Sequence, residues 1–125
     1  MTMSMREIFN KVEKHLLKQN EQSIDATTLL FGNGEGENCR YRTDSGLSCA
    51  VGCLMTDDMY DSSLEGDSVT DVAVVEALTP IIGVSPRHQA KKIDLLNRLQ
   101  IIHDDGQVDT WAYKLSALKL AFNIS

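Results

Sequence analysis

The sequence has few positive charges and few cysteines, and it lacks any long apolar run. Its 125 residues hold 12 Lys and Arg against 18 Asp and Glu, which gives a net charge of −6. General binding to nucleic acid needs Lys and Arg to neutralise phosphates, so this balance argues against that function while leaving room for a local basic site. No apolar stretch approaches the ~20 residues that a membrane-spanning helix requires, and we expect no membrane segment.

Residues 1–17 carry charges where a secretory signal peptide would carry an apolar stretch. We therefore expect a soluble, intracellular protein. Thiols stay reduced in that compartment, which argues against a structural disulfide. The three cysteines are also an odd number for a disulfide framework, and all of them fall between Cys39 and Cys53.

The spacing of apolar residues predicts a mainly α fold in a single compact domain over residues 1–125, with about five helices. The first helix is expected over about 5–19. Ser4 and Glu7 have the spacing of a capping box, in which each side chain accepts a hydrogen bond from the backbone N–H of the other residue. We see no internal repeat and no linker between domains.

Three further helices follow from their start and stop signals. One is expected over about 70–79, ending near Pro80. Another begins at Ser85-Pro86, a serine cap followed by a proline at the first helical position, and runs to about His103. Asp109 is expected to cap the last helix. The residues expected to face the core in the four helices are Ile8, Phe9, Val12 and Leu16; Val72, Val75, Ala77 and Leu78; Ile93, Leu96, Leu99 and Ile102; and Trp111, Leu115, Leu118 and Phe122.

The middle of the chain is harder to assign. Alternating residues with a turn at about 43–46 predict a small β-hairpin around residues 39–48. Residues 49–55 fit either a strand or a short buried helix, and their small side chains favour the helix. Glycines at 32–36 indicate a mobile loop or hairpin tip, because glycine loses the most backbone entropy on ordering. Residues 56–67 are acidic and typical of turns.

The cysteines allow three interpretations. Cys49 and Cys53 are four residues apart, so on a helix they would share a face. With Cys39 and a histidine such as His88 or His103 they would complete a four-ligand zinc site. A thiolate at Cys49 beside one of these histidines would be a nucleophile. The third interpretation, which we favour, is that the cysteines are small buried apolar residues and that no metal or other cofactor is bound.

A basic cluster predicts an anion site at the start of the third long helix. Cations at a helix N-terminus oppose the helix dipole unless an anion arrives. The cluster consists of Arg87, His88, Lys91 and Lys92, and a nearby hairpin would add Arg40 and Arg42.

The acidic segment is a candidate surface for a basic partner protein. Its carboxylates do not have the spacing of a calcium-binding EF-hand loop, so we expect solvated turns and helix caps in place of a metal. The residues proposed for partner binding are Asp57, Asp58, Asp61 and Glu65.

Several single residues have simpler explanations. His103-Asp104 matches the metal-binding pair of the HD phosphohydrolases, but the further ordered His and Asp residues of that family are missing. His103 is better explained as a favourable contact with a helix C-terminus. Tyr60 and Tyr113 are candidates to line a pocket, although a tyrosine with a bonded hydroxyl is common in cores.

Spaced short motifs resemble a family of small, uncharacterised proteins of tailed bacteriophages and prophages. The resemblance covers most of the chain, including the first helix and the residues 99–104 before the tryptophan helix. Its central motif consists of Cys39-Arg-Tyr-Arg, Gly46, Cys49-Ala-Val-Gly-Cys-Leu-Met, Asp58, Tyr60-Asp61 and Glu65-Gly66. The glycine-rich stretch 32–36 and the cysteine at position 53 depart from the usual family pattern.

The resemblance implies a protein of the host-cell cytoplasm. Small acidic accessory proteins of phages often act without catalysis, by binding a host enzyme, a defence protein or a signalling nucleotide. On this basis we expect a non-enzymatic counter-defence protein that modulates a host factor. A small enzyme using Cys49 with a histidine, and a zinc-stabilised module, are the alternatives, and self-association is left open.

Overall fold

The computed structural model describes residues 2–24, 40–43, 45–104 and 107–124. The glycine-rich stretch 32–36 lies outside these ranges. The described chain is mainly helical, as predicted. Its five α-helices are α1 (Met5–Gln19), α3 (Val72–Ala77), α4 (Thr79–Ile82), α5 (Pro86–Asp104) and α6 (Trp111–Ala121), and its short 3₁₀ helices are η2 (Gly52–Leu54), η3 (Ser62–Leu64) and η4 (Val108–Thr110).

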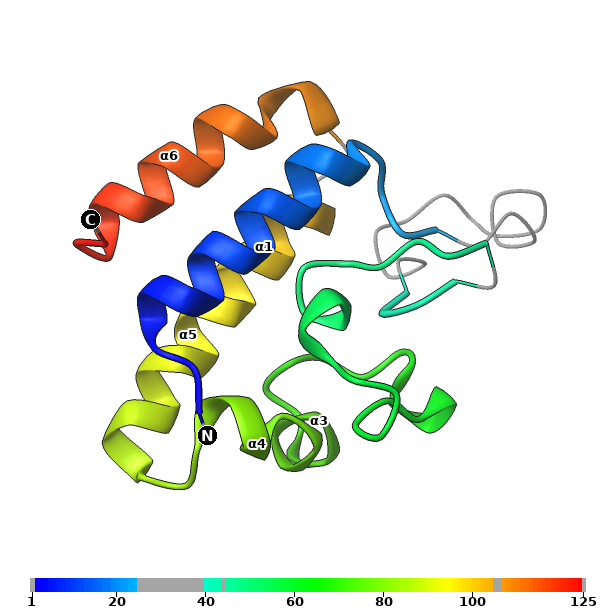
Figure 1. Ribbon diagram of the computed structural model, residues 1–125, viewed down its shortest axis with the longest axis vertical. Coiled ribbons are helices and arrows are strands. Elements are labelled where there is room, and N and C mark those ends of the chain that lie inside the picture. The colour runs from blue at the N-terminus through cyan, green and yellow to red at the C-terminus, as the bar shows by residue number, and fades with distance from the viewer. Residues whose placement is uncertain (1, 25–39, 44, 105–106, 125) are drawn as a thin grey trace.

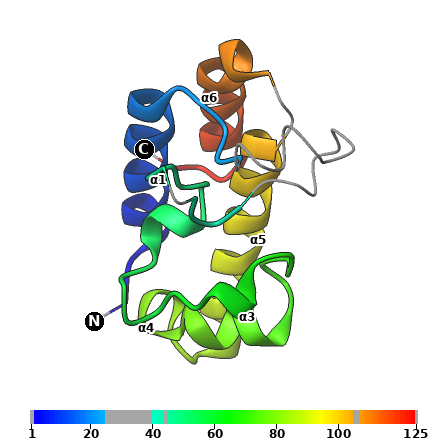
Figure 2. The ribbon, with the colours of Figure 1, turned by 90° about the vertical axis from the view of Figure 1, so that its right-hand side faces the viewer.

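Three long helices pack against one another. Helices α1 and α5 run in the same direction, and α6 returns in the opposite direction (Figure 1). The short helices η2, η3, α3 and α4 lie to one side of this group (Figure 2). Helix α1 contacts η2 and α5 contacts α4, so the two groups share one hydrophobic core.

The first helix confirms its predicted signals. The Ser4 hydroxyl oxygen accepts a hydrogen bond from the Glu7 backbone N–H at 3.1 Å, and the Glu7 carboxylate accepts one from the Ser4 N–H at 2.9 Å. These bonds hold the pKa of Glu7 below its usual value. The four residues expected to face the core are fully buried: Ile8, Phe9, Val12 and Leu16.

The helix predicted over 70–79 is divided into α3 and α4. Pro80 lies in the first turn of α4, where a missing N–H leaves no hydrogen bond unmade, so it starts a new helix after the old one. The expectation that Val72 faces the core is wrong, because its side chain is 73% exposed. Helix α3 begins only at this residue and buries its opposite face through Val74.

The β-hairpin predicted around residues 39–48 is not shown. Between residues 40 and 48 the described chain has one isolated antiparallel bridge, which joins Arg42 and Ser48. The backbone N–H groups of Tyr41 and Arg42 donate to the carboxylate of Glu65, so they are not available for a longer ladder. The bond that closes the expected turn is present: the Gly46 N–H donates to the Thr43 carbonyl oxygen at 3.1 Å.

The short buried helix expected over 49–55 is reduced to η2. The chain is tightly packed at this point, because the Tyr41 carbonyl oxygen accepts a hydrogen bond from the Cys49 N–H at 3.3 Å. A Cβ on Gly52 would overlap this carbonyl oxygen and would lie 2.7 Å from the carbonyl carbon. Glycine is therefore required where residues 40–42 cross the turn.

A buried histidine holds the end of α5 against the segment after α1. His103 is fully buried, and its Nε2 accepts a hydrogen bond from the Ser23 N–H at 2.9 Å. Its Nδ1 therefore carries the proton and donates to the Asp104 carboxylate at 2.8 Å. The Ser23 carbonyl oxygen in turn accepts from the Arg40 N–H at 2.7 Å. His103 is thus a structural tether, in addition to its place at a helix C-terminus.

The last helix differs from its prediction at its start. Asp109 was expected to cap it, but α6 begins after Thr110 without a side-chain cap. The 3₁₀ turn η4 leads directly into α6, and this continuous coil replaces the capped start. Trp111 and Leu115 are fully buried as expected, and the Trp111 ring stacks on His103 with centroids 5.6 Å apart.

Candidate functional site

Cys49 is fully buried and Cys53 is half-buried, and both thiols are protonated at neutral pH. Burial raises the pKa of the Cys49 thiol, and it raises the pKa of Cys53 to about 12. The Cys49 sulfur accepts a hydrogen bond from the Gly52 N–H at 3.2 Å, and the Cys53 thiol donates to the Ala50 carbonyl oxygen at 3.1 Å. Both sulfurs therefore close a tight turn, which agrees with the interpretation of small buried residues.

Two of the three histidines are hydrogen-bonded elsewhere in the fold, and the third is exposed. The His15 Nε2 is 2.9 Å from the Ser48 carbonyl oxygen, His103 is held by Ser23, and His88 lies exposed at the start of α5. No group of three His, Cys, Asp or Glu residues that could hold a metal occurs in the part of the chain that the structure describes. Cys39, the third candidate ligand, lies outside the described residues.

Glu65 is the centre of a polar network that we call the Glu65 corner. Its carboxylate accepts hydrogen bonds from the N–H groups of Tyr41 (2.9 Å) and Arg42 (3.2 Å) and from the Tyr60 hydroxyl (2.6 Å). The Arg40 side chain lies 3.9 Å from the same carboxylate. The Glu65 side chain is only 14% exposed. The prediction placed it on a partner-binding surface, whereas the structure places it inside the fold.

The predicted basic and acidic surfaces are partly paired with each other. Arg42 donates to the Asp57 carboxylate at 2.7 Å and to the Met55 carbonyl oxygen at 2.7 Å. Its guanidinium also lies 4.7 Å from the centre of the Tyr60 ring. Arg42 is therefore held by three neighbours of the Glu65 corner, and an anion would have to compete with Asp57 for it.

The anion-site residues are not brought together. Arg87, His88 and Lys91 are exposed, and Lys92 is half-buried, at the start of α5. Figure 1 places this end of α5 at the lower left, whereas residues 40–43 lie on the right. Arg40 and Arg42 therefore do not complete a site with the α5 cations.

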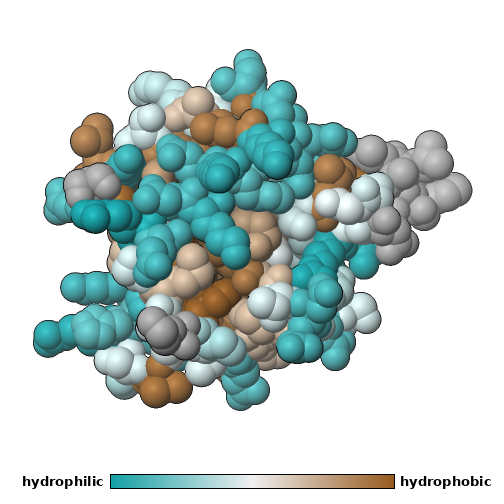
Figure 3. Space-filling model, in the orientation of Figure 1, coloured by the Kyte–Doolittle hydropathy of each residue, from teal (hydrophilic) through white to brown (hydrophobic). Residues whose placement is uncertain are grey.

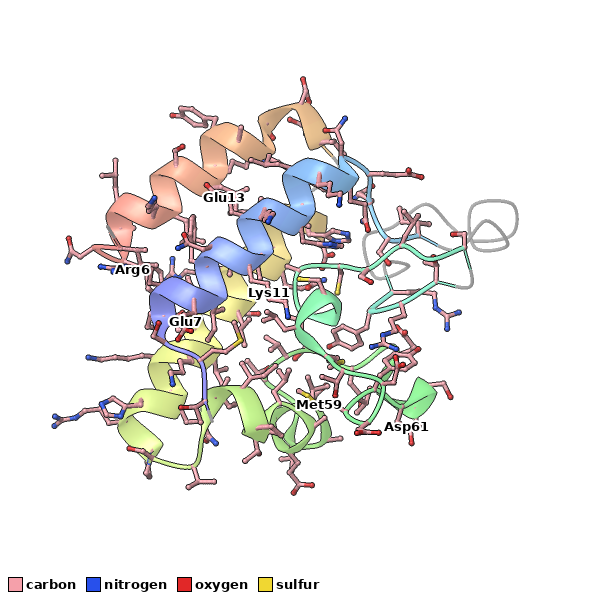
Figure 4. All side chains as sticks on the ribbon, viewed as in Figure 1. Arg6, Glu7, Lys11, Glu13, Met59 and Asp61 are labelled. Carbon is pink, nitrogen blue, oxygen red and sulfur yellow. The ribbon has the colours of Figure 1, made fainter. Side chains whose placement is uncertain are left out.

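The remaining acidic candidates are exposed, and one has a structural role. Asp61 caps η3 by accepting a hydrogen bond from the Ser63 N–H at 2.8 Å, which lowers the pKa of its carboxyl group. Figure 4 shows Asp61 at the lower right, on the other side of the molecule from α6. Asp57 and Asp58 are also exposed. These three residues lie on a solvated surface.

An open groove between α5 and α6, which we call the α5–α6 groove, combines apolar and basic lining residues. It has a volume of about 370 Å³ and lies between the outer faces of the two helices. Ile102 and Leu118 are nearly buried within it, and Ile101 and Tyr113 are exposed along it, at 59% and 78%. Tyr113 thus lines a pocket, as one of our predictions had it, whereas Tyr60 belongs to the Glu65 corner.

Helix α6 is apolar on both faces, but the fold covers only one. Trp111, Leu115 and Leu118 face the core. On the outer side Leu120 is 79% exposed, and small exposed alanines lie beside it. Figure 3 shows hydrophobic side chains among the hydrophilic ones over α6. A helix that is apolar all around is normally buried, so the outer face of α6 is suited to contact with a partner.

The sequence contained a signal for this face. Between Trp111 and Ala121 only Lys114, Ser116 and Lys119 are polar or charged, which is too few for a helix with one solvated side. The helical spacing of Trp111, Leu115 and Leu118 predicts the inner face, and the apolar residues between them form the outer face.

Nothing matches the chain in comparisons with protein-family models, curated proteins or solved structures. The resemblance to phage proteins is therefore still a prediction. Among the described residues no helix combines the length and the apolar character needed to cross a bilayer.

Proposed function

We propose that this protein acts without catalysis, by docking a partner protein in the α5–α6 groove. If the resemblance to phage proteins holds, the partner is a host factor whose activity the docking modulates. The observation that carries the proposal is the open apolar face of α6 beside a groove. Apolar side chains that the fold leaves exposed beside a groove are candidates for contact with another protein.

Two other observations favour a protein partner over the rival functions. A cysteine-dependent enzyme needs an accessible thiolate, whereas Cys49 is fully buried and its pKa is raised. A nucleotide site that uses Arg40 and Arg42 would have to disrupt the contacts of both residues with the Glu65 corner. The α5–α6 groove requires no such rearrangement.

A capture experiment with matched variants tests the proposal. The purified protein is immobilised, exposed to bacterial lysate and compared with the double variant Tyr113→Asp/Leu120→Asp. The control is Val84→Asp, because Val84 is 77% exposed and lies between α4 and α5, outside the groove. Circular dichroism confirms that all three proteins are folded.

We expect a partner that wild type and the control retain in equal amounts and that the double variant loses. The support comes from this difference between variants, because exposed apolar surface also captures proteins non-specifically. Equal capture by all three proteins, or no stoichiometric capture by any, would contradict the proposal.

A further inference from the structure

We propose that the occupant of the α5–α6 groove is an amphipathic helix with acidic flanks, presented by a different protein. This inference rests on the proposed function and adds the chemistry of the partner. It draws on two independent properties of the groove, its shape and its charge.

The shape fits a helix. The groove lies between two neighbouring helices, and its lining residues on α6 run from Tyr113 to Ala121, about 12 Å at 1.5 Å per residue, which matches about two turns of a partner helix. Two of its lining residues, Ala117 and Ala121, are small, so a partner backbone can come close to α6. The exposed Ile101 and Tyr113 on either side offer contacts to apolar residues spaced at three and four positions.

The charge fits an acidic partner. Arg98 and Lys114 are the charged residues that line the groove, and α6 carries Lys114 and Lys119 without any Asp or Glu. The rest of the protein has the opposite character: residues 1–85 hold six Lys and Arg against fourteen Asp and Glu. The groove is therefore a local cationic region on an acidic protein, and complementary charge selects an acidic partner.

Arg98 already has an acidic neighbour, but a weak one. Its Nε lies 3.2 Å from the Asp94 carboxylate, one helical turn earlier. Both side chains are more than half exposed, and such surface pairs contribute little to stability. The guanidinium also lies 5.8 Å from the centre of the Phe122 ring, which keeps it over the end of α6. A partner carboxylate can therefore replace or join Asp94 without disrupting the core.

A second copy of this chain fits less well. A two-fold dimer buries the same surface of each copy, so one interface would bring together two sets of the groove cations Arg98 and Lys114. Like charges brought together in this way oppose association. The same residues that disfavour self-association favour an acidic helix.

A peptide selection tests the inference directly. A displayed library of random linear peptides of about 15 residues, long enough for about four helical turns, is selected against the purified full-length protein. The enriched peptides are then measured by fluorescence anisotropy against wild type and the charge-reversed variant Arg98→Glu/Lys114→Glu. The matched control is Lys91→Glu/Lys92→Glu, which changes the net charge equally at the other end of α5.

We expect enriched peptides with apolar residues at helical spacing and Asp or Glu beside them. They should bind the charge-reversed variant at least about tenfold more weakly and the control nearly unchanged, and the loss should decrease in high salt. A selection repeated on the charge-reversed variant should enrich Lys and Arg instead. Binding should also be lost in Tyr113→Asp/Leu120→Asp.

Three results would overturn the inference, and they separate it from the proposed function. Peptides that require Tyr113 and Leu120 but show no acidic bias would refute the charge argument alone. A dimer at micromolar concentration in sedimentation, lost in Tyr113→Asp/Leu120→Asp, would identify a second copy as the occupant. Failure to enrich any peptide that depends on these two residues would count against the docking function itself.

Discussion

The Glu65 corner and the α5–α6 groove differ in where their side chains find partners. In the Glu65 corner, the charged and polar groups of Tyr41, Arg42 and Tyr60 are bonded to one another or to the backbone. At the groove Tyr113 is 78% exposed, and Leu120 on the outer face of α6 beside it is 79% exposed. The charged and polar residues of the Glu65 corner therefore stabilise the fold. The open apolar surface belongs instead to α6, a helix rich in Leu and Ala.

The largest effect should come from Gly52→Ala, which tests how tightly the first region is packed. The added Cβ would overlap the Tyr41 carbonyl group, which belongs to the backbone and cannot be moved by rotating a side chain. We expect the free energy of unfolding to fall by about 3 kcal/mol or more, measured by urea denaturation.

Gly46→Ala is the matched control for this change. Gly46 has a φ of 96° and open space around its Cβ position, so only backbone strain opposes an alanine, and we expect a loss of about 1 kcal/mol. Equal losses in the two variants would show that the Tyr41 contact is not what requires Gly52.

Glu65→Ala should produce the next largest loss, about 2–4 kcal/mol, because it leaves two backbone N–H groups and the Tyr60 hydroxyl without their acceptor. Glu65→Gln keeps one acceptor oxygen and should lose less. Asp57→Ala should change the unfolding free energy by less than about 0.5 kcal/mol, since the Asp57 side chain is 96% exposed. If chemical denaturation shows equal losses of unfolding free energy for Asp57→Ala and Glu65→Ala, Glu65 is not the main acceptor of the network.

Alkaline pH should destabilise the protein through the same region. Burial is the main cause that raises the pKa of Cys49 and of Tyr41 above their ordinary values of 9.0 and 10.0, so the folded state holds these protons more tightly than the unfolded state. Stability is therefore complete below about pH 9 and decreases as the pH rises towards the folded-state pKa values. Each group contributes about 1.4 kcal/mol per pH unit once it ionises in the unfolded state.

Denaturation curves between neutral pH and pH 10.5 measure this decrease. Tyr41→Phe should lose a constant amount of stability from its missing hydrogen bond to the Asp67 carbonyl oxygen, but its decrease above pH 10 should be shallower than in wild type. Peptide-resolved alkylation should label Cys49 only after unfolding. Rapid labelling of Cys49 in the native protein would contradict its burial.

The smallest effect on stability should come from Leu120→Ala, at most about 0.5 kcal/mol, because most of this side chain is already in water. Leu115→Ala on the same helix should cost about 2–5 kcal/mol, because Leu115 is fully buried. Thermal unfolding compares the two. Similar losses of unfolding free energy in the two variants would mean that Leu120 is packed as tightly as the core residue Leu115.

The sequence predicted the long helices because their signals are local. The Ser4–Glu7 capping box and Pro86 act within one turn, and both mark helix starts in the structure. The hairpin failed because a distant carboxylate takes the N–H groups of Tyr41 and Arg42, and spacing within residues 39–48 does not report Glu65. The α3–α4 break, in contrast, has a local signal, because Pro80 lies in the first turn of α4.

The candidate sites were less predictable than the helices for the same reason. Charged residues that are clustered in sequence, such as those at 40–42 and 57–65, proved to be mutual partners once the chain folded. The groove depends on α5 and α6 lying side by side, with Ile101 and Tyr113 on neighbouring helices. The spacing of residues within one helix does not predict which residues of another helix they will contact.

The hydrogen bonds of Ser23 have a practical consequence. Its N–H is bound to His103 and its carbonyl oxygen to the Arg40 N–H, so residues 23 and 40 are held together beside the end of α5. A substitution that removes the His103 ring is therefore expected to release the segment after α1 and residues 40–43 together, because Ser23 links both of them to the end of α5.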